Sequence, residues 1–192
     1  MQSVLPKEFY EKYDTLTLAE KLLGCSLVYD SPEGRTSGII VETEAYLKDD
    51  PACHAYRKKS VRNAPMFEGA GVAYVYQIYG MYYCFNIVSG VEGTGEAVLI
   101  RALEPVEGID LMQKRRKTNE LKNLCSGPGK LVIAMGITKE FNFMPMDSDE
   151  FYCTAPQNAD FDIFTTTRIG ITQGADLLYR FYVKGNKFIS KR

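Results

Sequence analysis

Two carboxylates and a phenol stand at alternate positions in one short, otherwise apolar stretch, Gly38 to Tyr46, which reads GIIVETEAY. Side chains on a β-strand alternate between two faces. An extended chain would place on one face Ile40, Glu42, Glu44 and Tyr46, and on the other Ile39, Val41, Thr43 and Ala45. A carboxylate beside a reacting group can activate water or transfer a proton. A half-solvated strand with two surface glutamates explains the same pattern.

A cationic side chain interrupts a second apolar run, Glu96 to Glu104, which reads EAVLIRALE. A guanidinium in a buried strand is costly unless a carboxylate or several acceptors compensate it. Arg101 is therefore predicted to need an acidic partner, and the face carrying Glu42 and Glu44 is the unpaired candidate. A purely structural ion pair would satisfy this requirement equally well.

Tyrosines gather in Val72 to Val88, VAYVYQIYGMYYCFNIV, which holds five of the 13 in the chain. The β-rich composition and the single Gly80 predict a hairpin with its tip at Tyr79 to Met81. An aromatic residue and a methionine at a turn expose apolar surface, which marks contact with another molecule. A hairpin buried under another element is the alternative.

Other elements must position these groups. A helix is expected at Thr15 to Leu23 with a capping box from Thr17 to Glu20, and a long loop, of a kind more often functional than not, at Asp49 to Gly71. The glycine-rich turn at Cys125 to Ile137 could present N–H groups to an anion, or simply cap a helix. The remaining expectations are strands at Cys25–Tyr29, Thr36–Tyr46, Arg168–Ile171 and Arg180–Val183, a helix opened by Pro105, an irregular stretch Phe141–Thr167, and a last hairpin into Lys187–Ser190.

Composition sets outer limits on the function. A chain of 192 residues with 45% hydrophobic and 24% charged residues fits one globular domain. No apolar run is long enough to cross a membrane and no signal peptide is recognisable, so we expect a cytoplasmic or nuclear protein. Five scattered cysteines read as reduced thiols, not as disulfides or a metal site. The net charge of −1 gives no support for a nucleic-acid partner, and the local basic clusters matter only if the fold gathers them on one side.

Four segments in order carry a resemblance: VETEAYL with His54 downstream, YVYQIYGMYYCFN, LIRALEP and SGPGKL. Together with the tail RIGI…RFYVKGN they resemble the alkyladenine (3-methyladenine) DNA glycosylase family, the type found in mammals and many bacteria, which is distinct from the helix-hairpin-helix glycosylases. The likeness covers about Phe9 to Ser190. It implies one mixed α+β domain over residues 1–192, with a curved antiparallel sheet, flanking helices, a protruding hairpin and a short flexible N-terminus at residues 1–8.

The resemblance also implies roles for individual residues. Glu44 matches the general base that activates the attacking water, and Arg101 matches an arginine that holds this water; Glu42 is then structural. The residues it places in the base pocket are Tyr46, His54, Tyr76 and Asn86, those that enter the duplex are Tyr79 and Met81, and the candidates for DNA-backbone contact are Arg57, Lys59, Arg62 and Lys130. Tyr56 and the stretch Asp147–Thr167 depart from the family pattern.

The implied activity is that of a monofunctional glycosylase of base-excision repair. It would flip 3-methyladenine, 7-methylguanine, hypoxanthine or etheno-adenine out of double-stranded DNA and hydrolyse the N-glycosidic bond, leaving an abasic site. No cofactor or metal and no membrane are implied, and we expect a monomer. A lesion sensor without turnover and a nucleoside hydrolase are the alternatives.

Overall fold

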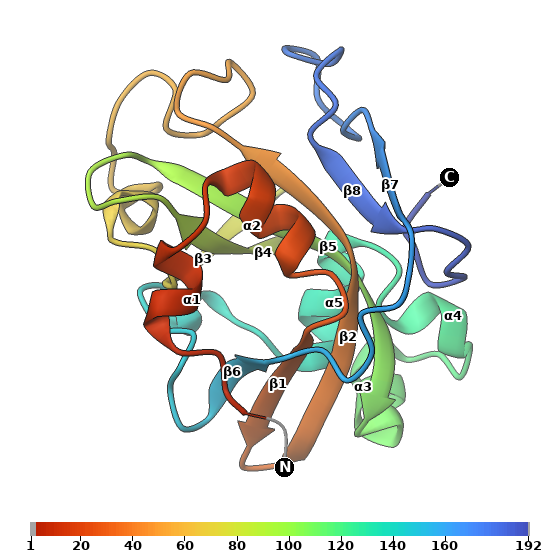
Figure 1. The fold of residues 1–192 in the computed structure, drawn as a ribbon. Helices are drawn as coiled ribbons and strands as arrows, with labels where there is room; N and C mark the ends of the chain where they lie inside the picture. The colour runs from red at the N-terminus through yellow and green to blue at the C-terminus, as the bar shows by residue number, and fades with distance from the viewer. Residues whose placement is uncertain (1–2, 192) are drawn as a thin grey trace.

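A curved antiparallel sheet of eight strands is the frame of the protein in this computed structural model, which describes residues 3–191 (Figure 1). The strand order is β3-β4-β5-β2-β1-β6, and β8 pairs with both β2 and β7. The single-domain α+β class is thereby confirmed. The strands are β1 Ser26–Ser31, β2 Gly34–Tyr46, β3 Ala73–Ile78, β4 Tyr82–Ser89, β5 Glu96–Glu107, β6 Phe151–Thr154, β7 Ile163–Thr166 and β8 Arg180–Val183.

Short helices pack around this sheet, with α1 and α2 in one group and α3 to α5 in another (Figure 1). The main core gathers apolar side chains of the sheet together with Leu18 of α2, Leu22 at its C-terminal end, and Leu131 and Met135 of α5. No helix in the described part of the chain is long and apolar enough to span a membrane. The helices are α1 Lys7–Glu11, α2 Thr15–Lys21, α3 Ile109–Arg116, α4 Leu121–Leu124 and α5 Pro128–Met135, with 3-10 turns η1 Ala64–Phe67 and η2 Lys139–Phe141.

The cap of α2 and the segment before α1 differ from expectation. Asp14, not Thr17, caps α2, because the extended Asp14 precedes the helix and its carboxylate accepts the Thr17 N–H at 2.8 Å. The expected capping box is therefore wrong. Within the expected flexible segment 1–8, Val4 bridges to Thr154 and the Leu5 N–H donates to Cys153 at 2.8 Å. Residues 1–2 lie outside the described part.

Four expectations for the second half of the chain are wrong. Pro105 does not open a helix, because β5 continues past it and pairs it with Gly38 of β2. The strand expected at Arg168–Ile171 lies earlier, as β7, and pairs with β8, while Arg168–Ile171 is a loop. Lys187–Ser190 forms no strand, and the stretch expected to be irregular contains β6 and β7. For Pro105, β6 and β7, pairing with another strand decides the structure.

A register shift on either side of Glu42 changes which side chains face the main core. Ile40 pairs with Leu103 and Glu42 with Ala102, which leaves Val41 without a partner residue in the ladder; Arg101 is left out on β5 in the same way. Such β-bulges redirect side chains and are common beside active sites. Ile40 consequently packs in the main core with Ala45, whereas simple alternation predicted opposite faces for them.

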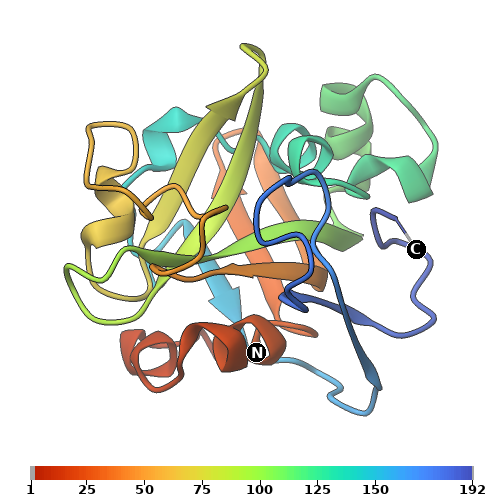
Figure 2. The same cartoon turned by 90° about the horizontal axis from the view of Figure 1, so that it is seen from above.

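The β3–β4 hairpin projects from the body of the protein, as predicted (Figure 2). Tyr79 and Gly80 at its tip have φ angles of 51° and 70°. Positive φ at both central residues is what a type I′ hairpin turn requires, but a non-glycine residue there costs about 1–2 kcal/mol. Tyr79 is 83% exposed and Met81 67% exposed. The tip therefore holds a strained, outward-facing aromatic side chain, and the alternative of a buried tip is excluded.

Candidate active site

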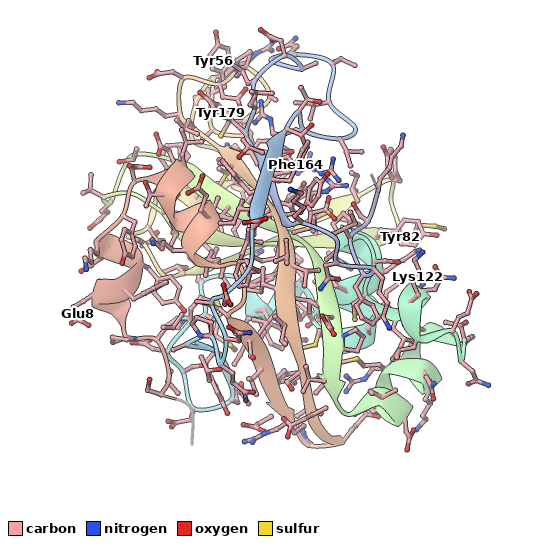
Figure 3. All side chains as sticks on the ribbon, turned by 45° about the vertical axis from the view of Figure 1, so that its right-hand side comes forward. Glu8, Tyr56, Tyr82, Lys122, Phe164 and Tyr179 are labelled. Carbon is pink, nitrogen blue, oxygen red and sulfur yellow. The ribbon has the colours of Figure 1, made fainter. Side chains whose placement is uncertain are left out.

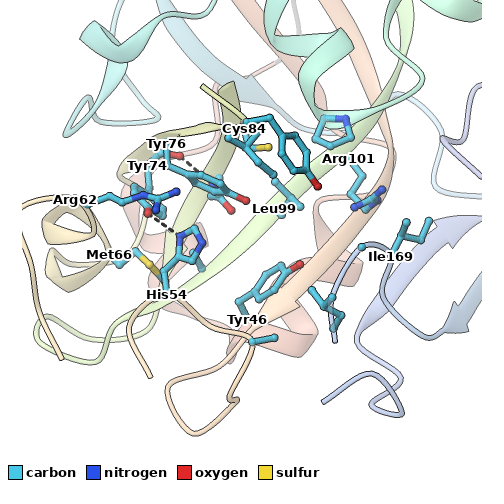
Figure 4. A pocket seen from close by; sticks show the side chains of 18 residues that line it. Tyr46, His54, Arg62, Met66, Tyr74, Tyr76, Cys84, Leu99, Arg101 and Ile169 are labelled. Carbon is cyan, nitrogen blue, oxygen red and sulfur yellow. Dashed lines mark hydrogen bonds between the residues drawn. The ribbon is translucent and has the colours of Figure 1, made fainter. Parts of the chain in front are cut away.

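A cavity of about 330 Å³ lies at the base of the hairpin, among β2, β5, the 52–66 loop and the 169–171 loop (Figure 4). All four residues expected in a base pocket line it. A cavity of this size is typical of small-molecule sites. Its lining residues are Tyr46, Ala52, His54, Arg62, Met66, Tyr74, Tyr76, Ile78, Tyr79, Cys84, Asn86, Ala97, Leu99, Arg101, Pro128, Ile169, Gly170 and Ile171.

Three aromatic rings meet on one side of the cavity. The His54 and Tyr76 ring centroids are 4.4 Å apart at 75°, and those of Tyr74 and Tyr76 are 5.3 Å apart. His54 Nδ1 lies 2.9 Å from the Tyr74 hydroxyl, and the Asn86 amide donates to the Tyr74 carbonyl at 3.1 Å. Tyr46 lies apart from this group (Figure 4). Tyr74, which was not predicted as a site residue, thus fixes both His54 and Asn86.

His54 is held as a neutral ring. Removal from water, and then the nearby Arg62 cation, lower its pKa below the ordinary histidine value. Part of the residue faces solvent at the mouth of the cavity, which limits the effect of burial. A neutral imidazole can donate one hydrogen bond and accept another. His54 can therefore contact the edge of a ligand without adding positive charge.

Glu44 lies directly behind the cavity wall and is 0% exposed. Its Oε2 accepts from the Tyr46 hydroxyl at 2.8 Å and pairs with Arg101 Nη1 at 3.2 Å, while its Oε1 accepts the Ile169 N–H at 2.8 Å. Burial, and then Glu44, raise the pKa of Tyr46 above its ordinary value, so the phenol keeps its proton and donates it. All three partners line the cavity. These three groups separate the carboxylate from the cavity.

Glu42 occupies a different environment on the same strand. Arg101 Nε and Arg180 Nε approach its Oε1 at 3.2 and 2.7 Å. The Ser190 hydroxyl also donates to Oε1, at 2.8 Å, and the Ser190 N–H donates to Oε2 at 2.5 Å. Burial disfavours the Arg101 cation, but Glu44 and Glu42 outweigh this effect and raise its pKa. The prediction that Arg101 needs an acidic partner is confirmed, because both Glu42 and Glu44 pair with it. The surface explanation for both glutamates is excluded.

A second buried ion pair, which sequence analysis missed, supports the loop that contacts Glu44. Both terminal nitrogens of Arg168 bond the Asp50 carboxylate, and Nη1 also donates to the Ala45 carbonyl at 2.9 Å. The guanidinium lies 4.7 Å from the centroid of the Tyr46 ring. It therefore fixes Tyr46 and places the next N–H, that of Ile169, at the Glu44 carboxylate. The RIGI motif, which begins with Arg168, could have indicated this arginine, but nothing in the sequence indicated Asp50 as its partner.

The basic candidates for DNA contact are dispersed. Arg62 lines the cavity, donates to the Gln77 carbonyl at 2.9 Å and lies 5.7 Å from the Tyr76 ring centroid. Lys130 bonds Asn123 and Ser126 at 3.2 and 3.3 Å. Arg57 and Lys59 are exposed on the long loop, and Lys59 lies 5.6 Å from the Phe67 ring centroid. Contact of these residues with DNA stays a prediction.

Among the described residues, no group of three or more His, Cys, Asp or Glu side chains could hold a metal ion. All five cysteines are free and buried. The polar groups that line the cavity are two guanidinium groups, phenols, an amide and one imidazole, with the Glu44 carboxylate behind them.

Comparison with known proteins shows the family of this chain. The model of the methylpurine-DNA glycosylase family matches residues 8–187. The chain belongs to the methylpurine-DNA glycosylase family. A Methanoculleus marisnigri protein is 52% identical over 98% of this chain and 99% of its own length, and a Carboxydothermus hydrogenoformans protein is 49% identical over 98% and 100%. A Clostridium acetobutylicum protein is 45% identical over 97% of each chain. All three are provisionally named 3-methyladenine DNA glycosylase.

Membership of the methylpurine-DNA glycosylase family confirms the resemblance inferred from the sequence motifs. The protein is an enzyme of DNA repair, a glycosylase that hydrolyses the N-glycosidic bond of a base in DNA. The family match covers all the residues that form the cavity and the hairpin.

Proposed function

We propose that this methylpurine-DNA glycosylase flips 3-methyladenine and 7-methylguanine out of duplex DNA and releases them with a water activated by Glu44, leaving an abasic site. The observation that carries the proposal is the fully buried Glu44 carboxylate, bonded to Arg101 and Tyr46 behind an aromatic cavity. The names of the relatives support the first substrate. One chain supplies every group of the site, so we expect a monomer in solution.

The reaction follows from these groups. Alkylation at N3 or N7 makes the purine cationic, so it stacks favourably against Tyr46 and Tyr76. Water attacks C1′, its proton passes to Glu44, and the electrons of the glycosidic bond leave with the purine. Since the alkylated base leaves readily, one carboxylate suffices where ordinary glycosidases use two. Hypoxanthine and etheno-adenine are neutral and need protonation as well, so we expect them to be released more slowly.

Asn86 is the proposed source of discrimination against normal guanine. Its side chain is buried, lines the cavity and is fixed by its bond to the Tyr74 carbonyl. A fixed amide at this position disfavours the 2-amino group, which guanine carries and adenine lacks; 7-methylguanine also carries this group, and we expect its cationic ring, which stacks favourably and leaves readily, to offset the cost. Burying an amino group against fixed polar atoms without a hydrogen bond is costly.

The proposal is tested by single-turnover base release from duplexes carrying one lesion each: 3-methyladenine, 7-methylguanine, hypoxanthine or etheno-adenine, with undamaged duplex as control. Release of an alkylated base, followed by alkali-dependent strand cleavage, is expected. Tight lesion binding without release would instead indicate a damage sensor. Equal rates on free nucleosides and duplexes would indicate a nucleoside hydrolase. Elution at twice the mass of the chain would contradict the expected monomer.

Tyr79 is expected to hold the flipped state open. Its exposed ring is set at the hairpin tip despite a strained backbone, and such strain is retained where surrounding structure and function support it. Stacking of an aromatic side chain on a base contributes about 1–3 kcal/mol. Tyr79→Ala is therefore expected to weaken binding to lesion duplex about tenfold or more, with a smaller loss for Tyr79→Phe. Fluorescence of a reporter base beside the lesion measures this change, and unchanged flipping in Tyr79→Ala would refute the role.

A further inference from the structure

Four lysines gather in a second cavity, of about 270 Å³, that the proposed reaction does not use. We call it the lysine groove. Within the described chain, none of its four lysines is in an ion pair, and no carboxylate lines it. The lining residues are Lys122, Asn123, Ser126, Lys130, Asn186, Lys187, Ile189, Ser190 and Lys191.

The lysine groove is more basic than the chain as a whole. The whole chain carries 23 Lys and Arg residues against 24 Asp and Glu residues. The neighbouring surface around Lys114 and Lys117 holds Asp110, which offsets part of its charge. In the lysine groove the other side chains are mainly neutral amides and hydroxyls, which donate hydrogen bonds to oxyanions. Its chemistry fits phosphate oxygens.

The lysine groove and the cavity of the candidate active site lie on either side of the turn at residues 126–130. Pro128 lines the base cavity, whereas Ser126 and Lys130 on either side of it line the groove. Gly129 lies against the ring of Tyr82, near enough that an added Cβ would be 3.6 Å from it, and Tyr82 begins the strand after the hairpin tip. Tyr82 and Lys122 lie on the same side of the molecule (Figure 3). DNA engaged by the hairpin would therefore run past the groove.

We propose that the lysine groove binds backbone phosphates of the DNA strand beside the flipped nucleotide. The inference rests on the proposed function, because it takes the cavity lined by Tyr46 and Tyr76 as the position of the flipped base. The groove is also tied to the catalytic groups. Ser190 on its wall bonds Glu42, which pairs with Arg101.

The salt dependence of DNA binding tests the groove. Each phosphate neutralised by a lysine contributes about 0.9 to the slope of log K against log salt concentration. The double variant Lys187→Gln, Lys191→Gln is expected to lower the magnitude of this slope by about 1 to 2 on a lesion duplex. Lys187→Arg, Lys191→Arg keeps both charges and is expected to keep the slope. The matched control is Lys114→Gln, Lys117→Gln, which removes the same charge outside the groove.

The slope and the rate separate the two proposals. With enzyme saturating at low salt, the groove variant should release the base at the wild-type rate, because its lysines do not touch the reacting atoms. A slope unchanged from wild type, or lowered equally by the control variant, would overturn the phosphate site while leaving base release intact. If wild-type protein releases no base although the slope falls as expected, the reaction is wrong and the groove remains a DNA-binding surface.

Discussion

Glu44→Gln is expected to slow single-turnover base release by about 10²–10⁴-fold, the usual contribution of a general base. Glutamine has nearly the same shape, so it can still accept the Ile169 N–H at one oxygen. Its amide cannot take a proton from water, and it presents N–H groups where Arg101 and Tyr46 now donate to Oε2. Attack on the sugar is then left to unactivated water.

Binding must be followed in parallel to interpret this loss. We expect the Glu44→Gln variant to bind lesion duplex within a few-fold of wild type, because Glu44 lies behind the cavity wall and does not line it. Glu44→Asp keeps the charge but withdraws the carboxylate by one methylene, and an intermediate rate is expected. Base release by Glu44→Gln at the wild-type rate would remove Glu44 from the mechanism, whatever the affinity.

Glu42→Gln is expected to lower the free energy of unfolding by about 3–5 kcal/mol, the cost of leaving buried charges without their partner. Glu42 is 0% exposed and compensates both Arg101 and Arg180. Arg101 keeps Glu44 in the variant, but Arg180 loses the carboxylate that lies 2.7 Å away. Any loss of base release in this variant would come from displacement of the Arg101 side chain and from the larger fraction of unfolded protein.

Urea unfolding measures this loss, and an ion pair with an exposed carboxylate supplies the control. Glu33 pairs with Arg115 at 2.9 Å, but its side chain is 58% exposed. Exposed pairs contribute about 1 kcal/mol or less, so Glu33→Gln should unfold near the wild-type midpoint. If Glu42→Gln and Glu33→Gln were equally stable, Glu42 would not be the buried counter-ion that the structure describes.

Sequence reasoning anticipated the features that follow from local chemistry. Arg101 in an apolar run needs a carboxylate, and the structure provides Glu42 and Glu44. The tyrosine-rich segment with Gly80 forms the predicted hairpin, because turn geometry and β-propensity act over a few residues. The motifs that carry the family resemblance were also sufficient to identify the family.

Features decided by distant contacts were not predictable. Arg168 and Asp50 are 118 positions apart, and neither segment reads as a partner for the other. The unpaired Val41 and Arg101 interrupt two neighbouring strands, and such a shift cannot be read from the alternation of either strand alone. For the same reason Ile40 was assigned to the wrong face, and β7 was placed five residues too late.

The hydrogen bonds from Ser190 to Glu42 join the end of the chain to strand β2. Ser190 is synthesised 148 positions after the carboxylate that it satisfies, whereas the β3–β4 hairpin emerges well before it. A nascent chain on the ribosome can therefore display Tyr79 long before Arg101 and Glu42 have all their partners. A chain that ended before Ser190 would leave the Glu42 carboxylate without two of its hydrogen bonds. The carboxylate that compensates Arg101 and Arg180 therefore has all its partners only when the end of the chain has folded against β2.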